Sequence, residues 1–251
     1  MKKFQRYQEI KNILNSYKHV EVKFLAKNFK VTEETIRRDL EYLESQNTLK
    51  RTHGGATLAN KDDLSYYYRS TKNLDLKKLI ASKALNYLKD KESIMVDSSS
   101  TALEAIRLLS SKSYAPKIIT NSINLLYEFS NTNLNFISTG GRLNKHSGTL
   151  VGAQSIETIK NYYTQAVLLS CNTMSTDGFS VGGEEEGLTK KRMLQQSNLI
   201  IMLVDSTKIL SNENAYFKFA DYNNIDLIIT DNTNFPESIK KAIEYYNISV
   251  I

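Results

Sequence analysis

The sequence predicts an α/β protein in two parts: a small helical segment that ends in a hairpin, and a larger domain with a mostly parallel sheet. Two observations support this division. Residues 1–61 hold 13 Lys+Arg against 7 Asp+Glu, whereas residues 62–251 hold 20 of each, so the net charge of +6 belongs to the first quarter. Short aliphatic runs alternate with helical stretches only after residue 90. A basic segment joined to a neutral one is typical of a polyanion-binding head on a body with another task.

The head, residues 1–57, is expected to contain three helices and a hairpin. Apolar residues at helical spacing predict helices over 4–16, 23–29 and 33–46, with Asn47 as the stop of the third. Thr32 is expected to cap the third helix with its side-chain oxygen. Glu33 and Glu34 follow it, where the positive end of the helix dipole favours carboxylates. Residues 48–52 and 56–58 are expected to pair around a glycine-containing tip. This order is that of a winged helix-turn-helix.

The third helix has one apolar and one polar face. Ile36, Leu40 and Leu43 form a stripe for packing, and threonine and arginine lie away from it. A recognition helix in a DNA major groove needs this arrangement, although an ordinary amphipathic helix with a solvated charged face has it too. The residues expected to contact DNA, from this helix and from the hairpin, are Thr32, Thr35, Arg37, Arg38, Lys50, Arg51, His53, Gly54 and Gly55.

The body, residues 74–251, follows a polar linker at 58–73 that holds a tyrosine cluster. Helix 74–89 is expected to turn Leu76, Leu79, Ile80, Ala84, Leu85 and Leu88 inward. Strands are predicted at 93–97, 117–121, 134–138, 166–171, 199–205 and 225–230, with 248–251 as an edge strand. Further helices are predicted at 101–109, 122–129, 154–162, 185–196 and 236–245. Such a pattern indicates a parallel sheet covered on both faces.

Small polar residues follow four of these strands. They read Asp97-Ser98-Ser99-Ser100-Thr101, Thr120-Asn121-Ser122, Thr139-Gly140-Gly141-Arg142 and Asp205-Ser206-Thr207-Lys208. Ligands of parallel sheets bind beyond the carboxyl ends of the strands, and hydroxyl and N–H groups at helix N-termini hold phosphate. The ends of the strands therefore predict a site for a phosphorylated sugar, although serine and threonine are also common helix caps.

The sequence resembles the DeoR family of bacterial transcriptional repressors. The resemblance rests on Thr35-Ile36-Arg37-Arg38-Asp39-Leu40 and His53-Gly54-Gly55-Ala56 at the right separation, and it continues through Asp97–Thr101, Thr120–Ser122, Gly140-Gly141, Lys190 and Asp205–Lys208. It implies an effector domain similar in fold to ribose phosphate isomerases that senses a phosphorylated sugar. Thr32 and Asn47 replace the family's usual serine and glycine. Ser99 and Ser100 replace its usual Gly-Thr, and Ser99 adds a side chain where the backbone approaches phosphate.

We therefore expect a repressor that binds double-stranded operator DNA as a homodimer or homotetramer and is released by a phosphorylated sugar. The residues expected to bind this effector are Asp97, Ser98, Ser100, Thr101, Asn121, Gly140, Gly141, Glu185, Lys190 and Lys208. Two alternatives remain at this stage. One is a sugar-phosphate isomerase with a DNA-binding arm, which would need one of its acidic residues as a general base. The other is a DNA-binding protein whose body only dimerises.

Other features of the sequence limit the classes of function. The single cysteine, Cys171, allows no intramolecular disulfide and is expected to be a core thiol, which fits a reducing compartment. His19, His53 and His146 lack metal-ligand spacing, and we expect neither a metal nor a cofactor. No apolar run is long enough to cross a bilayer. We expect a cytoplasmic protein without enzymatic turnover.

Overall fold

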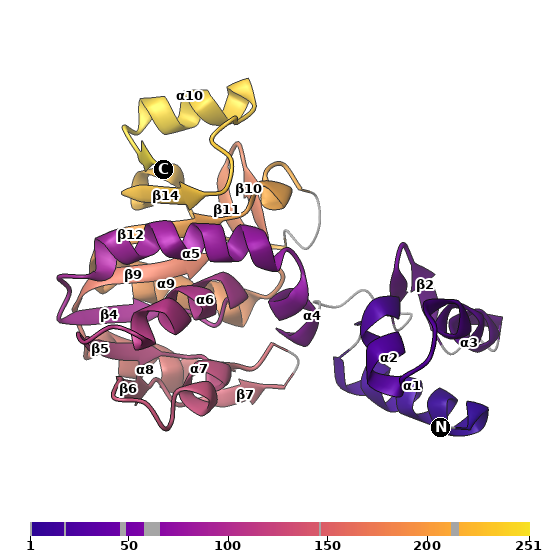
Figure 1. Cartoon of the computed structure of the whole chain (residues 1–251). Coiled ribbons are helices and arrows are strands. Elements are labelled where there is room, and N and C mark those ends of the chain that lie inside the picture. Colours follow the sequence, from indigo (N-terminus) through magenta and orange to yellow (C-terminus); the bar gives the residue numbers. More distant parts are fainter. Residues whose placement is uncertain (1, 18, 46–48, 58–65, 146, 212–215) are drawn as a thin grey trace. The chain divides into compact units, whose positions relative to one another are not determined.

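The structure is a computed structural model that describes residues 2–17, 19–45, 49–57, 66–145, 147–211 and 216–251. It divides into two compact units, Met1–Lys72 and Asn73–Ile251, which are described separately (Figure 1). The predicted helix stop at Asn47, most of the predicted linker and His146 lie outside the described residues.

The first unit is a winged helix-turn-helix, as the sequence predicts. Its elements are α1 (Lys3–Tyr17), β1 (His19–Glu21), α2 (Val22–Phe29), α3 (Glu33–Ser45), β2 (Lys50–Thr52), β3 (Gly55–Thr57) and α4 (Tyr66–Thr71). The sheet has the order β1-β3-β2 and is antiparallel, so the hairpin gains a third strand that the sequence analysis did not identify as its partner. The helix α4 occupies part of the segment that was expected to be a linker.

The core of this unit lies between the helices. Ile36, Leu40 and Leu43 of α3 are almost fully buried, which confirms the predicted stripe, and they meet Ile10 of α1 and Leu25 of α2. The turn between α2 and α3 begins at Lys30, whose backbone is left-handed with φ of 54°. Thus α3 is held by one face and leaves the other to solvent.

The second unit is built on a seven-stranded parallel sheet of order β15-β14-β12-β9-β4-β5-β6. The strands are β4 (Ser93–Val96), β5 (Lys117–Thr120), β6 (Asn135–Ser138), β9 (Thr164–Ser170), β12 (Ser197–Val204), β14 (Leu227–Thr230) and β15 (Ser249–Val250). All seven predicted strands are present, and the last one lies at an edge as expected. The α/β fold class is confirmed.

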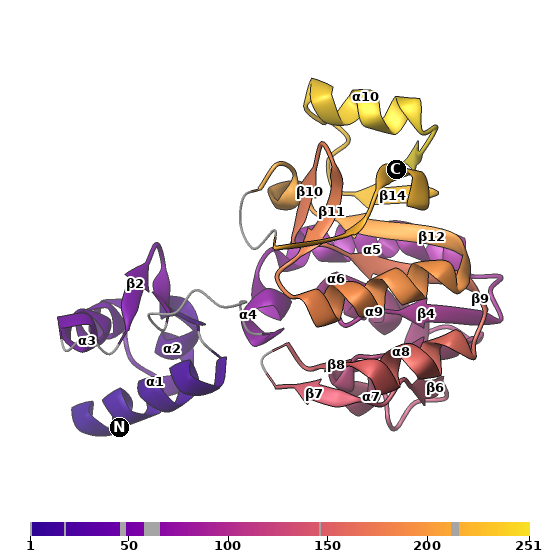
Figure 2. The same ribbon diagram turned by 180° about the vertical axis from the view of Figure 1, so that it is seen from behind.

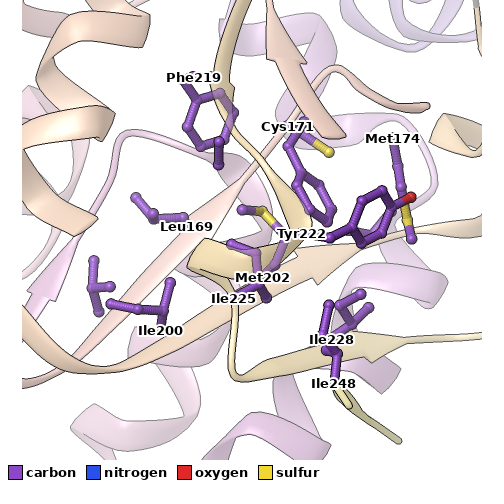
Figure 3. Close-up of a cluster of buried hydrophobic side chains, with 14 of the residues drawn as sticks. Leu169, Cys171, Met174, Ile200, Met202, Phe219, Tyr222, Ile225, Ile228 and Ile248 are labelled. Atoms are coloured by element: carbon purple, nitrogen blue, oxygen red, sulfur yellow. The ribbon is translucent and has the colours of Figure 1, made fainter. Parts of the chain in front are cut away.

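Helices cover both faces of the sheet (Figures 1 and 2). On one face lie α5 (Leu74–Leu88), α6 (Ser100–Ser110) and α7 (Ile123–Glu128). On the other lie α8 (Ala153–Lys160), α9 (Glu184–Gln195) and α10 (Glu237–Tyr245). Strand residues alternate between the two cores: Ile201 and Leu203 face the first, and Ile200, Met202 and Val204 the second. Figure 3 shows the second core around Met202, Phe219 and Tyr222.

Several short elements were not predicted. They are the antiparallel pair β7 (Arg142–Asn144) and β8 (Thr149–Val151), the sheet of β10 (Thr173–Ser175), β11 (Gly178–Val181) and β13 (Phe217–Ala220), and the 3-10 turns Ser206–Lys208 and Tyr222–Asn224. Each has only three or four residues, too few to show a clear hydrophobic period. No helix within the described ranges combines the length and apolarity that a membrane span requires.

The inward face of α5 differs from the prediction. Leu79 was expected to point inward, but it is 45% exposed, whereas Lys77 is only 4% exposed. Ile80, Ala84 and Leu88 are buried as expected. The helix is therefore rotated so that Lys77 enters the interior, where its charge acts on Asp205.

Candidate functional site

The exposed face of α3 carries the predicted DNA contacts. Thr32 Oγ1 accepts a hydrogen bond from the Thr35 backbone N–H at 3.2 Å, which confirms the predicted cap. Arg37 Nη2 lies 2.7 Å from Glu33 Oε2, and Arg38 Nε lies 3.4 Å from Glu34 Oε1. All four of these charged side chains are well exposed, so the ion pairs are weak and a DNA phosphate or base edge could replace the glutamates.

The hairpin of β2 and β3 places Lys50, His53 and Gly54 at the surface. Gly54 needs its glycine backbone, since its φ is 96°. Arg51 is held in place: Nη1 lies 2.6 Å from Glu41 Oε1, and its backbone N–H donates to Glu44 Oε1.

Gly55, another residue expected to contact DNA, lies in β3 next to β1. It is buried, and a Cβ there would lie 2.0 Å from the Val20 carbonyl oxygen. This glycine lets β3 pair closely with β1.

A hollow of about 260 Å³ brings three of the predicted residues together. It lies where β1, the start of α2, the first turns of α3 and the hairpin tip meet. Its lining residues are His19, Glu21, Val22, Lys23, Glu33, Arg37, His53 and Gly54. Arg37, His53 and Gly54 therefore belong to one concave surface, although they come from separate elements.

Sequence analysis assigned no role to the buried ion pair of Arg6 with Asp39. Arg6 Nε lies 2.7 Å from Asp39 Oδ2, and its Nη2 lies 3.1 Å from Oδ1, with both side chains buried. The hydrogen bond to Asp39 raises the pKa of Arg6. The pair fixes α1 against α3. Its signal in the sequence was an aspartate beside the apolar stripe of an otherwise regular amphipathic helix.

In the body, the predicted polar strand ends meet at one edge of the sheet. This follows from the parallel order, because β4, β5, β6 and β12 all end on the same side. The end of β9, at Ser170, lies at the same edge. The strand was predicted, but Ser170 was not expected to belong to the site. Its backbone N–H and hydroxyl connect to groups from the other strands.

Two serines of the loop after β4 form hydrogen bonds that hold the loop in place. Ser99 has an extended backbone with φ of −73°, and its hydroxyl caps α6 by accepting from the Ala102 N–H at 3.1 Å. A serine therefore fits this position without strain. Ser98 Oγ accepts from Thr149 Oγ1 at 2.7 Å, which links this loop to β8.

Asp97 lies fully buried beneath that loop. Its carboxylate accepts from the backbone N–H groups of Ser99 and Ser170, each at 2.8 Å, and forms an ion pair with Lys190. Burial by itself raises the pKa of Asp97, but Lys190 and these hydrogen bonds outweigh it and hold the pKa below its usual value. Lys190 also lies 3.5 Å from Glu186 and donates to the Ser170 carbonyl. Protein groups thus surround both side chains.

A second group of charges lies after β12. Lys208 Nζ donates to Ser170 Oγ at 2.9 Å and lies 3.4 Å from Asp205 Oδ2, and its side chain remains 21% exposed. Burial by itself raises the pKa of Asp205. This effect is outweighed by the charge of Lys208, a hydrogen bond from Thr207 and the charge of Lys77, so the pKa of Asp205 lies below its usual value. The burial of Lys77 was not predicted from the sequence. Its signal was a lysine within the apolar positions of the helix over 74–89.

Two polar atoms near these strand ends have no hydrogen-bond partner among the described residues. They are Thr101 Oγ1, in the first turn of α6, and Asn121 Oδ1, directly after β5. Both residues are 1% exposed. The amide nitrogen of Asn121 donates to the Leu150 carbonyl, which fixes the side chain. A buried acceptor without a partner costs free energy, so these atoms indicate where a polar ligand or water binds.

The turn after β6 lies at the same edge of the sheet and contains two glycines. Gly140 and Gly141 have φ of 63° and 109°, and a Cβ on Gly141 would lie 2.6 Å from the Val151 carbonyl oxygen. Both glycines are therefore required by the backbone. Arg142 follows and forms an ion pair with Glu185 of α9.

Two expectations about other chemistry concern Cys171 and metals. Cys171 is buried, and burial raises the pKa of its thiol to about 11, as befits a core residue. Within the described ranges, no group of three or more His, Cys, Asp or Glu side chains is placed to hold a metal ion.

Comparisons with known proteins match each of the two units to a domain of the same family. Residues 6–62 match the family described as "DeoR-like helix-turn-helix domain", and residues 72–232 match "DeoR C terminal sensor domain". An uncharacterized HTH-type transcriptional regulator of Bacillus subtilis, YulB, is 34% identical over 98% of this chain and 95% of its own. The repressor GlcR of the same organism is 30% identical over 90% and 88%. The lactose phosphotransferase system repressor of Lactococcus lactis is 27% identical over 99% and 98%.

Solved structures that match part of this chain include ribose 5 phosphate isomerase A from Neisseria gonorrhoeae. It has 18% identity and a TM-score of 0.41 over 56% of each chain. The translation initiation factor eIF-2B of Pyrococcus horikoshii has 15% identity and a TM-score of 0.45 over 80% of this chain and 69% of its own.

Proposed function

The chain belongs to the DeoR family of helix-turn-helix transcriptional regulators, and we propose that it represses a sugar-metabolism operon and leaves its operator when a phosphorylated sugar binds the second unit. Relatives over nearly the whole chain are named as transcriptional repressors, one of them of the lactose phosphotransferase system. These names describe the relatives. They supply the class of operon for this proposal.

On the DNA side, α3 is the reading helix. Its inner face is fixed by the core and by the Arg6–Asp39 pair, and its outer face presents Thr35, Arg37 and Arg38. Lys50 and Arg51 of the hairpin contact the phosphate backbone. A dimer or tetramer places two such helices on two half-sites, because regulators of this kind bind paired sequences.

On the effector side, the proposal is carried by two buried atoms, on Thr101 and Asn121, that have no hydrogen-bond partner in the described part of the chain. They lie where the parallel strands end, beside the N-terminus of α6. Hydroxyl groups of the sugar satisfy Asn121 Oδ1 and Thr101 Oγ1, and the phosphate of the sugar lies toward the loop 98–101 and Lys208. Ser98 and Ser100 stand in that loop, and the glycine turn 140–141 lets the backbone close over the ligand.

Asp97 and Lys190 take a different part in this proposal from the one the sequence indicated. Each satisfies the other in the interior, so together they hold β4, β9 and α9 in register beneath the ligand. Breaking such a buried pair is costly, so Asp97 and Lys190 stay paired and do not contact the sugar. We call this pair the floor of the site.

The test begins by selecting an operator from random duplexes and then measures its release by a panel of pentose and hexose phosphates. We expect one of these phosphates to raise the thermal midpoint of the protein and to release the DNA, without turnover. Conversion of the sugar during incubation would favour the isomerase. Neither stabilisation nor conversion by any sugar phosphate would leave a DNA-binding protein whose body only dimerises.

Replacing Lys208 separates the two activities. Lys208→Ala is expected to lose the thermal shift with the sugar phosphate and to keep operator binding, which gives a repressor that does not respond to effector. Lys112→Ala, an exposed lysine past the end of α6, serves as the control and should respond normally. Loss of DNA binding in folded Lys208→Ala would move the effector site elsewhere.

A further inference from the structure

Arg142 and Glu185 form an ion pair at the rim of the strand-end site. Arg142 begins β7 directly after the glycine turn, and Glu185 lies in the first turn of α9. Their side chains are 65% and 48% exposed. Glu185 Oε1 also lies 4.0 Å from where a Cβ on Gly152 would stand, and Gly152 precedes α8. The carboxylate therefore stands beside the start of α8, where negative charge is favoured.

This pair belongs to the same edge of the sheet as the buried charges. Lys190 follows Glu185 by five residues on α9, which is about 7.5 Å along a helix axis. Lys190 in turn contacts Asp97 at the end of β4. On the other side, Thr139 precedes the glycine turn and accepts from the hydroxyl of Ser155 in α8. The rim and floor of the site are thus joined by α9 and by the turn.

The two lysines that follow these strands or lie beneath them already have acidic partners. Lys190 faces Asp97 and Glu186, and Lys208 faces Asp205. A phosphate monoester carries a charge between −1.5 and −2 at neutral pH and needs additional positive charge. Breaking a buried pair is strongly unfavourable, whereas an exposed pair contributes little to stability. Arg142 is therefore a cation that can change partners at small cost.

We propose that Arg142 binds the phosphate of the effector and that Glu185 occupies its guanidinium when no effector is bound. The inference rests on the sensor function proposed above and names how its site recognises phosphate. A guanidinium binds carboxylate and phosphate oxygens with the same two-pronged geometry, so one anion replaces the other directly. The exchange also removes the contact that Arg142, at the start of β7, makes with α9.

The test is a calorimetric titration of the full-length protein with the sugar-phosphate panel, the matching unphosphorylated sugars and inorganic phosphate. We expect Arg142→Ala to weaken the binding of the strongest sugar phosphate at least tenfold, with Arg142→Lys in between. Glu185→Gln should tighten the binding several-fold, because the competing charge is gone. The double variant should bind no better than Arg142→Ala alone. Glu157→Gln, which removes an exposed partner of Lys160 on α8, is the matched control and should change nothing.

Each other outcome has a definite meaning. Equal binding by wild type and Arg142→Ala overturns the inference and leaves the sensor function in place. Weaker binding by Glu185→Gln shows that Glu185 contacts the ligand, which overturns its assigned part. Absence of binding to every sugar phosphate in the wild type overturns both the inference and the sensor function. Circular dichroism of each variant without ligand establishes that it is folded.

Discussion

At the scale of single residues, Arg38 is more exposed than Arg37 on α3, with 77% against 48% of the side chain accessible. We predict that Arg38→Ala weakens operator binding by about 1–3 kcal/mol if the guanidinium binds a base edge in two-pronged fashion. A phosphate contact would instead weaken binding to all sequences alike. Gel-shift titrations with the selected operator and a scrambled duplex distinguish these results.

The control for this prediction is Glu34→Ala. It removes the partner of Arg38 but leaves the arginine free, so operator binding should be unchanged or tighter. If Arg37→Ala and Arg38→Ala both bind the operator as the wild type does, α3 is not the reading helix.

Asp39 tests how the first unit is held together. Asp39→Asn keeps the shape of the side chain but leaves the buried charge of Arg6 unbalanced, and we predict a loss of about 3–5 kcal/mol in the free energy of unfolding. Urea unfolding measures this loss when it is monitored by hydrogen exchange in peptides from α1 and α3. Glu33→Gln, which removes an exposed partner of Arg37, should cost less than about 1 kcal/mol. A loss as small for Asp39→Asn would mean that the pair does not fix α1 to α3.

At the scale of elements, the hairpin of β2 and β3 is predicted to act through charge. Each phosphate that it neutralises adds about −0.9 to the slope of log affinity against log salt. Replacing Lys50 and Arg51 by alanine should therefore flatten the slope by up to about two units. An unchanged slope would place the hairpin away from the backbone.

The structure adds a refinement, because Arg51 is already paired with Glu41 of α3. DNA must compete with that carboxylate. Glu41→Gln is therefore expected to raise operator affinity, most strongly at low salt, in the same shift assay. Lower affinity would indicate that the pair orients Arg51 for DNA.

At the scale of the whole molecule, acid should destabilise the two units over different pH ranges. Burial, and then the charge of Lys72, lower the pKa of His19 to about 4. The unfolded first unit binds a proton near pH 6.5 and the folded one does not, so its stability is full above pH 6.5 and falls towards pH 4, by up to about 1.4 kcal/mol per pH unit. The pKa values of Asp97 and Asp205 lie below normal, so their contribution is lost only below about pH 4.

Calorimetry of the full chain between pH 7.5 and 4.5 checks this prediction. The unfolding transition of the first unit, identified by its shift in Asp39→Asn, should move to lower temperature while that of the second unit stays nearly constant. His19→Gln should remove most of the movement. Parallel shifts of both transitions would show that His19 does not control acid sensitivity.

The sequence by itself determined the long helices and the strands of the parallel sheet, and the order in which they occur. The stripe of Ile36, Leu40 and Leu43 predicted both the helix and its buried face, and near-continuous aliphatic runs predicted the strands of the parallel sheet. These signals are local, because the period of apolar residues records which face is buried. The order of strands and helices then placed the polar loops at one edge of the sheet, and so the region of the candidate site.

Only the tertiary structure decided what the polar residues contact. Asp97 and Lys190 are 93 positions apart and pair in the interior, Lys77 enters the core beside Asp205, and Gly55 is required by the approach of β1. None of these contacts has a periodic signal, because each depends on how separate elements pack together. The same is true of the β7–β8 hairpin and of Arg142, whose partner Glu185 is 43 positions later in the chain. Local pattern predicts most of the buried apolar residues, and the packing of distant elements decides which charged residues are buried and what they contact.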